Sequence, residues 1–305
     1  MPLDDPSHHE LPEQQDPADP ADPVDELQDT PVAMTARWVA AMRAQESARP
    51  DRLFNDPWAA QLAGEDGMAQ LQRPRAERRR DTSVFVVIRT RFFDDLLLHA
   101  AREEGIRQIV LLAAGMDTRA WRLAWPEETT LFEIDQPGVL AAKAQVLSAP
   151  RAIPTCDRYS ISADLTQLDW PDKLLAAGFQ PDAPSAWLIE GLLAYLPDDA
   201  VDRLLKEVAT LTAPGSRLGT ETFNTATLAS PLMGARLSYL ERRGVPWRFA
   251  VDEPERWLAA YGWQATVSQP GEDGASFGRW PHPVPSRRNT RYTGLRIFLI
   301  SARRL

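Results

Sequence analysis

Short apolar runs alternate with helical patterns through most of this chain. The runs of strand length are 107–115, 130–135, 158–165, 185–190 and 216–223, and helical segments separate them at 116–125, 136–147, 173–179 and 198–212. A run such as IVLLAAG within 107–115, which is apolar and ends in small residues, is typical of a buried parallel strand. Strands that alternate with helices predict an α/β fold with a doubly wound, mostly parallel sheet.

Helical patterns also precede the alternating region. The apolar spacing over 35–47 predicts a helix that begins with Thr35 as its cap, and 53–64 predict a turn followed by a short helix. A long amphipathic helix is predicted over 82–105, with Gly105 at its end.

The region after the fifth strand completes the predicted sheet. Residues 224–250 have the pattern of an inserted helical segment. A helix over 252–262 and two further strands over 263–269 and 294–304 follow it. With these two strands the sheet has seven.

Charge divides the chain into a tail and a body. Residues 1–31 contain ten acidic residues, seven prolines and no Lys or Arg. The whole chain has 43 acidic and 34 basic residues, so the rest carries 33 acidic against 34 basic residues and is nearly neutral. The tail cannot bury enough apolar surface to offset its ordering entropy, and we predict that it is disordered. A neutral body gives no reason to expect nucleic acid as a partner.

Other features exclude several classes of protein. No stretch approaches the roughly 20 apolar residues that span a bilayer, and the first residues lack the pattern of a secretory signal. Cys156 is the only cysteine and there are four histidines, which argues against a disulfide scaffold and against a Cys/His metal site. We therefore expect a cytoplasmic protein with no metal and no membrane partner.

The ends of the predicted strands carry the candidate chemistry. In an open α/β sheet, ligands bind outside the carboxyl ends of the strands. Small residues from Ala113 to Gly115 end the first strand, and Asp135 ends the second, about 20 residues on. Such an acid can accept hydrogen bonds from ribose hydroxyls. Asp164 and Leu165 follow the third strand and offer a carboxylate and an apolar wall to an adenine ring. This arrangement fits an adenosine-containing cofactor.

Two such cofactors compete for the site. A nicotinamide dinucleotide needs the glycines of G-x-G-x-x-G, which let its pyrophosphate rest on a helix N-terminus. Here the turn reads AAGMDTR, and Asp117 would bring a negative charge to the pyrophosphate. S-adenosyl-L-methionine has no phosphate and carries a cationic sulfonium, so acids around the site would help. The strand ends, including Glu190 after the fourth strand, therefore favour the methyl donor.

Five blocks of the sequence, in order, resemble the leucine carboxyl methyltransferase family, and most closely its bacterial branch. The blocks are RTRFFDDLL (89–97), IVLLAAGMDTRAWRL (109–123), LFEIDQP (131–137), SADL (162–165) and LIEGLLAYLP (188–197). The similarity covers roughly residues 33–305. It implies a class I, Rossmann-like methyltransferase domain over 32–305, with a helical lid over 32–81. The α/β core over 82–305 then carries the insertion at about 224–250.

The resemblance also implies which residues hold the donor. Arg89 is expected to pair with the methionine carboxylate of S-adenosyl-L-methionine, and Asp135 to hold the ribose. The remaining positions are the turn residues Ala113 and Gly115, the adenine contacts Asp164 and Leu165, and the acid Glu190 that lines the donor pocket. At position 113 this chain has alanine, whereas the eukaryotic protein-modifying members of the family have glycine.

These observations predict an S-adenosyl-L-methionine-dependent O-methyltransferase, which would release S-adenosyl-L-homocysteine. We favour a carboxylate acceptor on a small molecule, a polyketide or a peptide, because carboxylates are ionised at pH 7 and need no general base. A hydroxyl of an aromatic natural product is the alternative, and it would benefit from a base. Tyr195 and Arg91 are candidate acceptor contacts, although an ion pair with Asp94 or Asp95 would equally explain Arg91.

Functions outside this class stay open from the sequence alone. They are a NAD-dependent oxidoreductase, a nucleic-acid methyltransferase and a non-catalytic binding protein that kept the fold. The first lacks a visible proton-transfer residue, and the second lacks a basic face. Arg89, Asp135, Asp164 and Glu190 argue against the third. The sequence leaves the oligomeric state open.

Overall fold

The computed structural model describes residues 31–72, 83–231, 233–287 and 295–305. Residues 1–30, which form almost all of the acidic tail, lie outside the described residues, and its predicted disorder stays a prediction. No helix in the described part of the chain is both long enough and apolar enough to cross a bilayer.

A seven-stranded sheet forms the centre of the molecule, with the strand order β3-β2-β1-β4-β5-β7-β6. The first five strands are parallel, and β7 runs antiparallel to both of its neighbours. Their bounds are β1 (Gln108–Leu112), β2 (Thr130–Asp135), β3 (Asp157–Ser162), β4 (Ser185–Ile189), β5 (Arg217–Phe223), β6 (Trp263–Ser268) and β7 (Ile297–Arg304). The predicted α/β class and the mostly parallel, seven-stranded sheet are confirmed.

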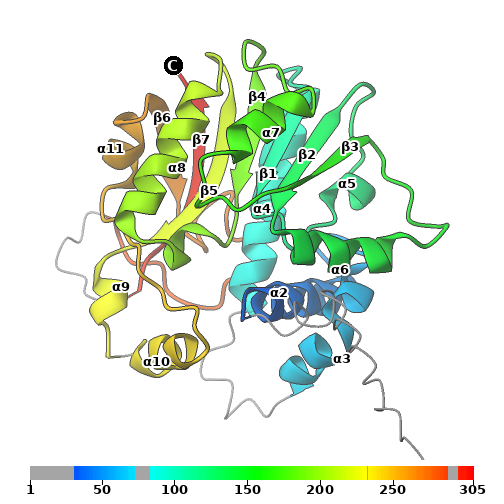
Figure 1. Ribbon diagram of the computed structural model, residues 1–305. Helices are drawn as coiled ribbons and strands as arrows, with labels where there is room; N and C mark the ends of the chain where they lie inside the picture. Colours follow the sequence, from blue (N-terminus) through cyan, green and yellow to red (C-terminus); the bar gives the residue numbers. More distant parts are fainter. Residues whose placement is uncertain (1–30, 73–82, 232, 288–294) are drawn as a thin grey trace, which may run out of the picture.

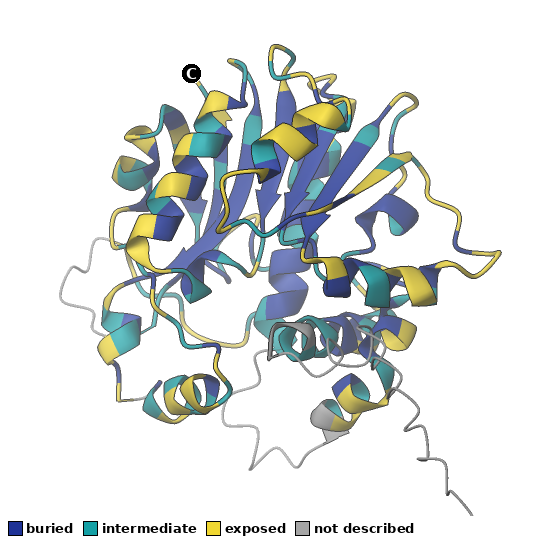
Figure 2. Ribbon diagram, in the orientation of Figure 1, coloured by how far each residue is buried: buried dark blue, intermediate teal, exposed yellow. Residues whose placement is uncertain are grey.

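Helices cover both faces of this sheet (Figure 1). The helix that precedes β1 is α4 (Ser83–Arg102). The helices that connect or follow strands are α5 (Arg119–Arg122), α6 (Pro137–Leu147), α7 (Trp170–Ala176), α8 (Asp198–Thr210) and α11 (Pro254–Ala259), with a 3-10 turn η1 (Leu193–Tyr195) after β4. Along β1, Ile109 and Leu111 pack into one apolar cluster, whereas Val110 and Leu112 pack into the cluster on the other face. The central strands are therefore buried on both sides, as Figure 2 shows.

Further helices lie at the end of the sheet where the parallel strands have their carboxyl ends (Figure 1). They are α2 (Pro31–Ser47), α3 (Ala59–Gln72), α9 (Ala226–Ala229) and α10 (Gly234–Arg242). The last two lie within the predicted insertion at 224–250. The predicted cap at Thr35 is wrong, because α2 begins earlier, at Pro31. Proline is favoured in the first turn of a helix, since its missing N–H has no partner there in any case.

Candidate active site

A cavity of about 390 Å³ opens beside the carboxyl ends of the parallel strands. The strand order reverses between β1 and β4, which is the point where open α/β sheets bind ligands. Every residue that was predicted to hold the donor lines this cavity, namely Arg89, Ala113, Gly115, Asp135, Asp164, Leu165 and Glu190. Tyr195 lines it as well, whereas Arg91 is not part of the lining.

The turn after β1 has an unusual backbone. Gly115 has a φ of 49°, and Ala113 has a φ of 53°, a left-handed conformation that costs a residue with a Cβ roughly 1–2 kcal/mol. The Ala114 N–H donates to the Ile134 carbonyl at 3.2 Å, which joins the turn to β2. Strain of this kind persists where the surrounding structure holds the chain in place, and it clusters at functional sites.

Asp135, at the end of β2, fixes this turn. Its Oδ2 accepts the Gly115 N–H at 2.6 Å, and its Oδ1 accepts the Gln136 N–H at 2.7 Å. Burial raises the pKa of the Asp135 carboxyl, and the two backbone donors and Lys143 oppose that rise. Each carboxylate oxygen retains a lone pair, so Asp135 can accept further hydrogen bonds from hydroxyl groups in the cavity.

Asp164 and Leu165 follow β3 at the far side of the cavity. The Oδ1 of Asp164 accepts both the N–H and the hydroxyl of Thr166, at 2.9 and 2.8 Å. Burial would raise the pKa of Asp164, but these hydrogen bonds hold it below its ordinary value. The carboxylate is thus ionised and oriented, with an apolar side chain next to it.

Arg89 extends into the cavity from α4 and contacts two glutamates. Its Nη1 donates to Glu221 Oε1 at 2.8 Å, and its Nε lies 2.8 Å from Glu190 Oε1. Its Nη2 donates no hydrogen bond to a described residue. Gly191 packs against this guanidinium with a φ of 72°, and a Cβ there would come within 3.4 Å of Nη1. Arg89 is therefore held firmly and keeps one N–H group for a ligand.

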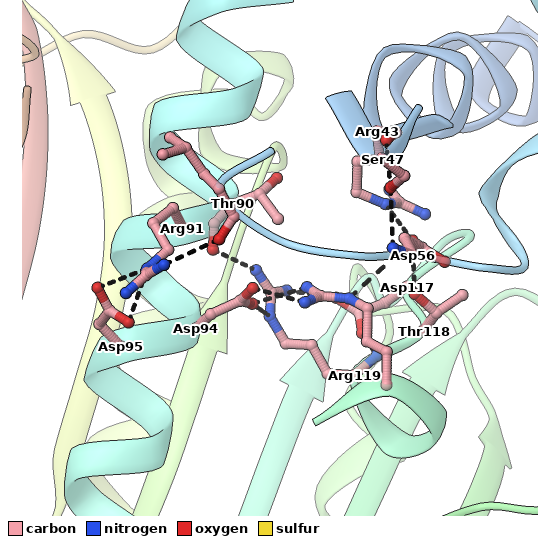
Figure 3. A network of polar contacts seen from close by, with 12 residues as sticks. Arg43, Ser47, Asp56, Thr90, Arg91, Asp94, Asp95, Asp117, Thr118 and Arg119 are labelled. Carbon is pink, nitrogen blue, oxygen red and sulfur yellow. Dashed lines mark hydrogen bonds and ion pairs between the residues drawn. The ribbon is translucent and has the colours of Figure 1, made fainter. Parts of the chain in front are cut away.

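Arg119, on α5, joins three acids that come from three different parts of the chain. Figure 3 shows two of them, Asp94 and Asp117. The Nε of Arg119 donates to Asp94 Oδ1 on α4 at 2.7 Å, and its Nη1 lies 2.8 Å from Glu190 Oε2. The same Nη1 also donates to Asp117 in the turn after β1. Burial alone would raise the pKa of Glu190, but Arg119 and Arg89 hold it below its ordinary value.

The network continues toward the N-terminal helices. Arg122 donates to both oxygens of Asp94, at 2.5 and 2.7 Å. In α2, Arg43 donates to Asp56 Oδ2 at 2.9 Å, and the Thr118 hydroxyl donates to the same oxygen at 2.7 Å. This chain of charges connects α2 to the turn after β1, as Figure 3 shows. It fixes one wall of the cavity.

Sequence reasoning did not single out most of this network. Asp94 and Arg119 lie 25 residues apart on different elements, and Glu221 lies 132 residues beyond Arg89. The available signal was a cluster of charges inside the blocks 89–97 and 109–123, where apolar residues would otherwise be expected next to a buried strand.

Arg91 lies outside the cavity lining, on the other side of α4 from the donor site. Its Nε donates to both oxygens of Asp95 at 2.9 Å, and its Nη1 donates to the Leu53 carbonyl at 2.8 Å. The structure therefore provides the ion pair that was the alternative explanation for Arg91.

Comparison with known proteins agrees with this geometry. The family model described as leucine carboxyl methyltransferase matches residues 36–209. A protein of Streptomyces coelicolor that carries the name of an S-adenosyl-L-methionine-dependent methyltransferase is 42% identical over 281 residues, which cover 85% of this chain and 92% of that protein. A protein of Parafrankia with a name of the same kind is 44% identical over 248 residues, covering 76% of this chain and 77% of its own length.

A solved structure shares the fold. The crystal structure of a protein from Thermobifida fusca, named as a methyltransferase, superposes with a TM-score of 0.60 at 18% identity. The match covers 93% of this chain and 99% of the other.

Proposed function

This chain belongs to the leucine carboxyl methyltransferase family and is an S-adenosyl-L-methionine-dependent methyltransferase, and from that premise we propose that it methylates a carboxylate. The acceptor would be a small molecule or a natural-product intermediate such as a polyketide or peptide, and the product a methyl ester. The donor supplies a methyl group attached to a positively charged sulfur. The residues of this chain bind and orient the donor and the acceptor around that methyl group.

The cavity has the groups that the donor requires. We propose that Asp135 accepts hydrogen bonds from the ribose hydroxyls, through the lone pairs that Gly115 and Gln136 leave unused. Arg89 would bind the methionine carboxylate through Nη2, since its other nitrogens contact Glu190 and Glu221. The left-handed turn after β1 then lets the donor approach the backbone closely.

The remaining donor contacts are those to the adenine ring and to the sulfonium. Asp164 and Leu165 would contact the edge and the face of the adenine ring, as their positions in the lining allow. Glu190 remains ionised between Arg89 and Arg119, so it presents negative charge inside the cavity. A fixed, partly desolvated carboxylate of this kind favours a cationic ligand.

One observation carries the choice of acceptor: among the described residues that line the cavity, none outside the donor site is suited to act as a general base. No histidine is among the lining residues in the described part of the chain. The carboxyls of Asp117, Asp164 and Glu190 have pKa values below their ordinary range, which makes them weak bases. Asp135, whose pKa burial raises, already accepts two backbone N–H groups and is the residue that we assign to the ribose. A carboxylate acceptor is ionised at pH 7 and needs no base, whereas a phenol with a pKa near 10 would need one.

The test is a methyl-transfer assay that separates esters from ethers. The enzyme is incubated with S-adenosyl-L-methionine labelled in its methyl group and with panels of carboxylic acids and phenols. We expect label in products that release methanol in mild base, as methyl esters do. Asp135→Ala serves as the donor-site control and should give no labelled product. Label found only in base-stable methyl ethers would refute the carboxylate assignment.

A further inference from the structure

A second cationic group lies beside the cavity, and the donor site does not use it. Arg236, on α10, has its guanidinium between two indole rings, with Cζ at 5.4 Å from the centroid of Trp38 and 5.3 Å from that of Trp247. Trp38 lies on α2 and Trp247 on the segment after α10. In the described part of the chain, the Arg236 side chain forms no ion pair and no hydrogen bond.

Arg236 and Trp247 each have a buried N–H donor without an acceptor. Neither the Nε of Arg236 nor the Nε1 of Trp247 has a hydrogen-bond partner among the described residues, and both atoms are buried. Buried N–H groups are normally satisfied, and leaving one unpaired costs about 1–3 kcal/mol. An anion with acceptor oxygens would satisfy two unpaired donors, one of them cationic, on side chains whose guanidinium and ring centroid lie 5.3 Å apart.

This pair of donors borders the methyl-transfer cavity. Pro246 and Arg248, the neighbours of Trp247 in sequence, both line the cavity, and so does Tyr195. Tyr195 also lies within electrostatic range of both Arg236 and Arg89, so it links the second cation to the donor site.

The surroundings of Arg236 are apolar. Trp247 stacks on Phe223 with ring centroids 4.4 Å apart and planes 18° apart, and Phe85 lies 6.3 Å from Phe223. Burial lowers the pKa of the Arg236 guanidinium, and its stacking partners are uncharged. An anion bound here would be shielded from water, which strengthens its hydrogen bonds to both donors. An acceptor that combines a carboxylate with an apolar body fits both the charge and the rings.

We propose that Arg236, together with the Trp247 N–H, binds the carboxylate of an acceptor that has an apolar body. The inference rests on the proposed function and adds to it the residue that selects the acceptor. In the reaction a lone pair on a carboxylate oxygen forms the new O–C bond, the S–C electron pair stays on sulfur, and no proton moves. The neutral ester then has lost the charge that Arg236 binds, which favours product release.

The experiment measures acid preference in the complex with S-adenosyl-L-homocysteine. Decanoate and 3-phenylpropionate are titrated calorimetrically beside their uncharged primary amides. We expect the wild type to bind at least one acid about tenfold or more tightly than its amide. Arg236→Met should abolish that preference and raise the KM of any methylated acid by a similar factor. The matched control is Arg242→Met, an exposed arginine on the same helix, which should behave as the wild type.

Further readouts keep the proposal open to refutation. Trp247→Phe retains an aromatic ring and removes the indole N–H together with the five-membered ring that carries it, so the acid preference should fall several-fold even if Arg236→Met does not fold. The affinity for S-adenosyl-L-homocysteine should stay unchanged in all folded variants. Equal binding of acid and amide by the wild type, or an unchanged preference in the Arg236→Met and Trp247→Phe variants, would overturn the proposal.

The two proposals can fail separately. Acid binding that depends on Arg236, without any base-labile methyl ester, would refute the proposed function and leave this inference standing. Formation of a methyl ester with an unchanged KM in Arg236→Met would support the proposed function and refute the role of Arg236.

Discussion

The buried carboxylate of Asp94 offers the sharpest test of the charge network. Asp94 accepts hydrogen bonds from Arg119 Nε at 2.7 Å and from Arg122 Nη1 and Nη2 at 2.5 and 2.7 Å. All three side chains are at most 4% exposed. Asp94→Asn keeps the shape but removes the charge and turns an acceptor into a donor. Breaking a buried pair by changing one partner costs about 3–5 kcal/mol, because it leaves a buried charge uncompensated.

The next residue on α4 provides the matched control. Asp95 pairs with Arg91, and these side chains are 45% and 38% exposed. Exposed pairs of this kind contribute about 0–1 kcal/mol. Asp95→Asn is therefore the same substitution, one position away on the same helix, with a much smaller expected loss.

Urea unfolding at pH 7 measures both variants. We expect the free energy of unfolding to fall at least about 2 kcal/mol further in Asp94→Asn than in Asp95→Asn, with equal m-values. The affinity for S-adenosyl-L-homocysteine should also fall in the Asp94 variant alone, because Arg119 positions Glu190. A difference below about 1 kcal/mol between the two variants would refute the reasoning that the network stabilises this wall of the cavity.

The donor site and the tail can be tested in four other ways. Asp135→Ala should abolish S-adenosyl-L-homocysteine binding in calorimetry while circular dichroism shows a folded chain; affinity like that of the wild type would contradict the ribose assignment. Ala113→Gly should leave donor affinity unchanged and alter stability by no more than about 1 kcal/mol in urea, since relief of the left-handed strain is offset by a more flexible unfolded chain. Burial would raise the pKa of Asp117, but Arg119 and other cations lower it to about 2. Because this folded-state pKa lies below the unfolded value, the stabilisation is present above about pH 4 and is lost as the pH falls toward 2. Between these pH values the wild type should therefore lose about 2 kcal/mol more stability than Asp117→Asn, and parallel losses would count against the pairing. Deleting residues 1–30 should leave turnover unchanged, and a large loss would show that the tail takes part in the site.

The elements of the core were predictable because their signal is local. The strand predicted over 130–135 is β2 at the same bounds, since TLFEID is rich in apolar residues and ends in an acid that lines the cavity. The helix predicted over 82–105 is α4, three residues shorter at its end. Apolar periodicity depends on neighbours in sequence, and a single chain displays it directly.

The charge network was not predictable in the same way. Both Asp94 and Asp95 follow Arg91 at helical spacing, so sequence alone could not tell which carboxylate is buried. The structure places Asp94 against Arg119, 25 residues away, and leaves Asp95 partly exposed. Pairings of this kind depend on how α4 packs against the turn after β1, which no local pattern encodes. The same holds for Arg236 and Trp38, which lie about two hundred residues apart in the chain.

The position of β7 has a consequence for how the protein is made. Among the described elements this strand comes latest in sequence, yet it lies inside the sheet, between β5 and β6. During synthesis on the ribosome, β1 to β5 can pair as they emerge, because domains form from the N-terminal side as the chain grows. Until residues 297–304 leave the exit tunnel, β5 has one open edge and β6 has no partner in the sheet. The nascent polypeptide therefore needs residues 297–304 before the hydrogen-bonding edges of β5 and β6 are closed, and a stop codon within this strand would leave those edges free to pair with other chains.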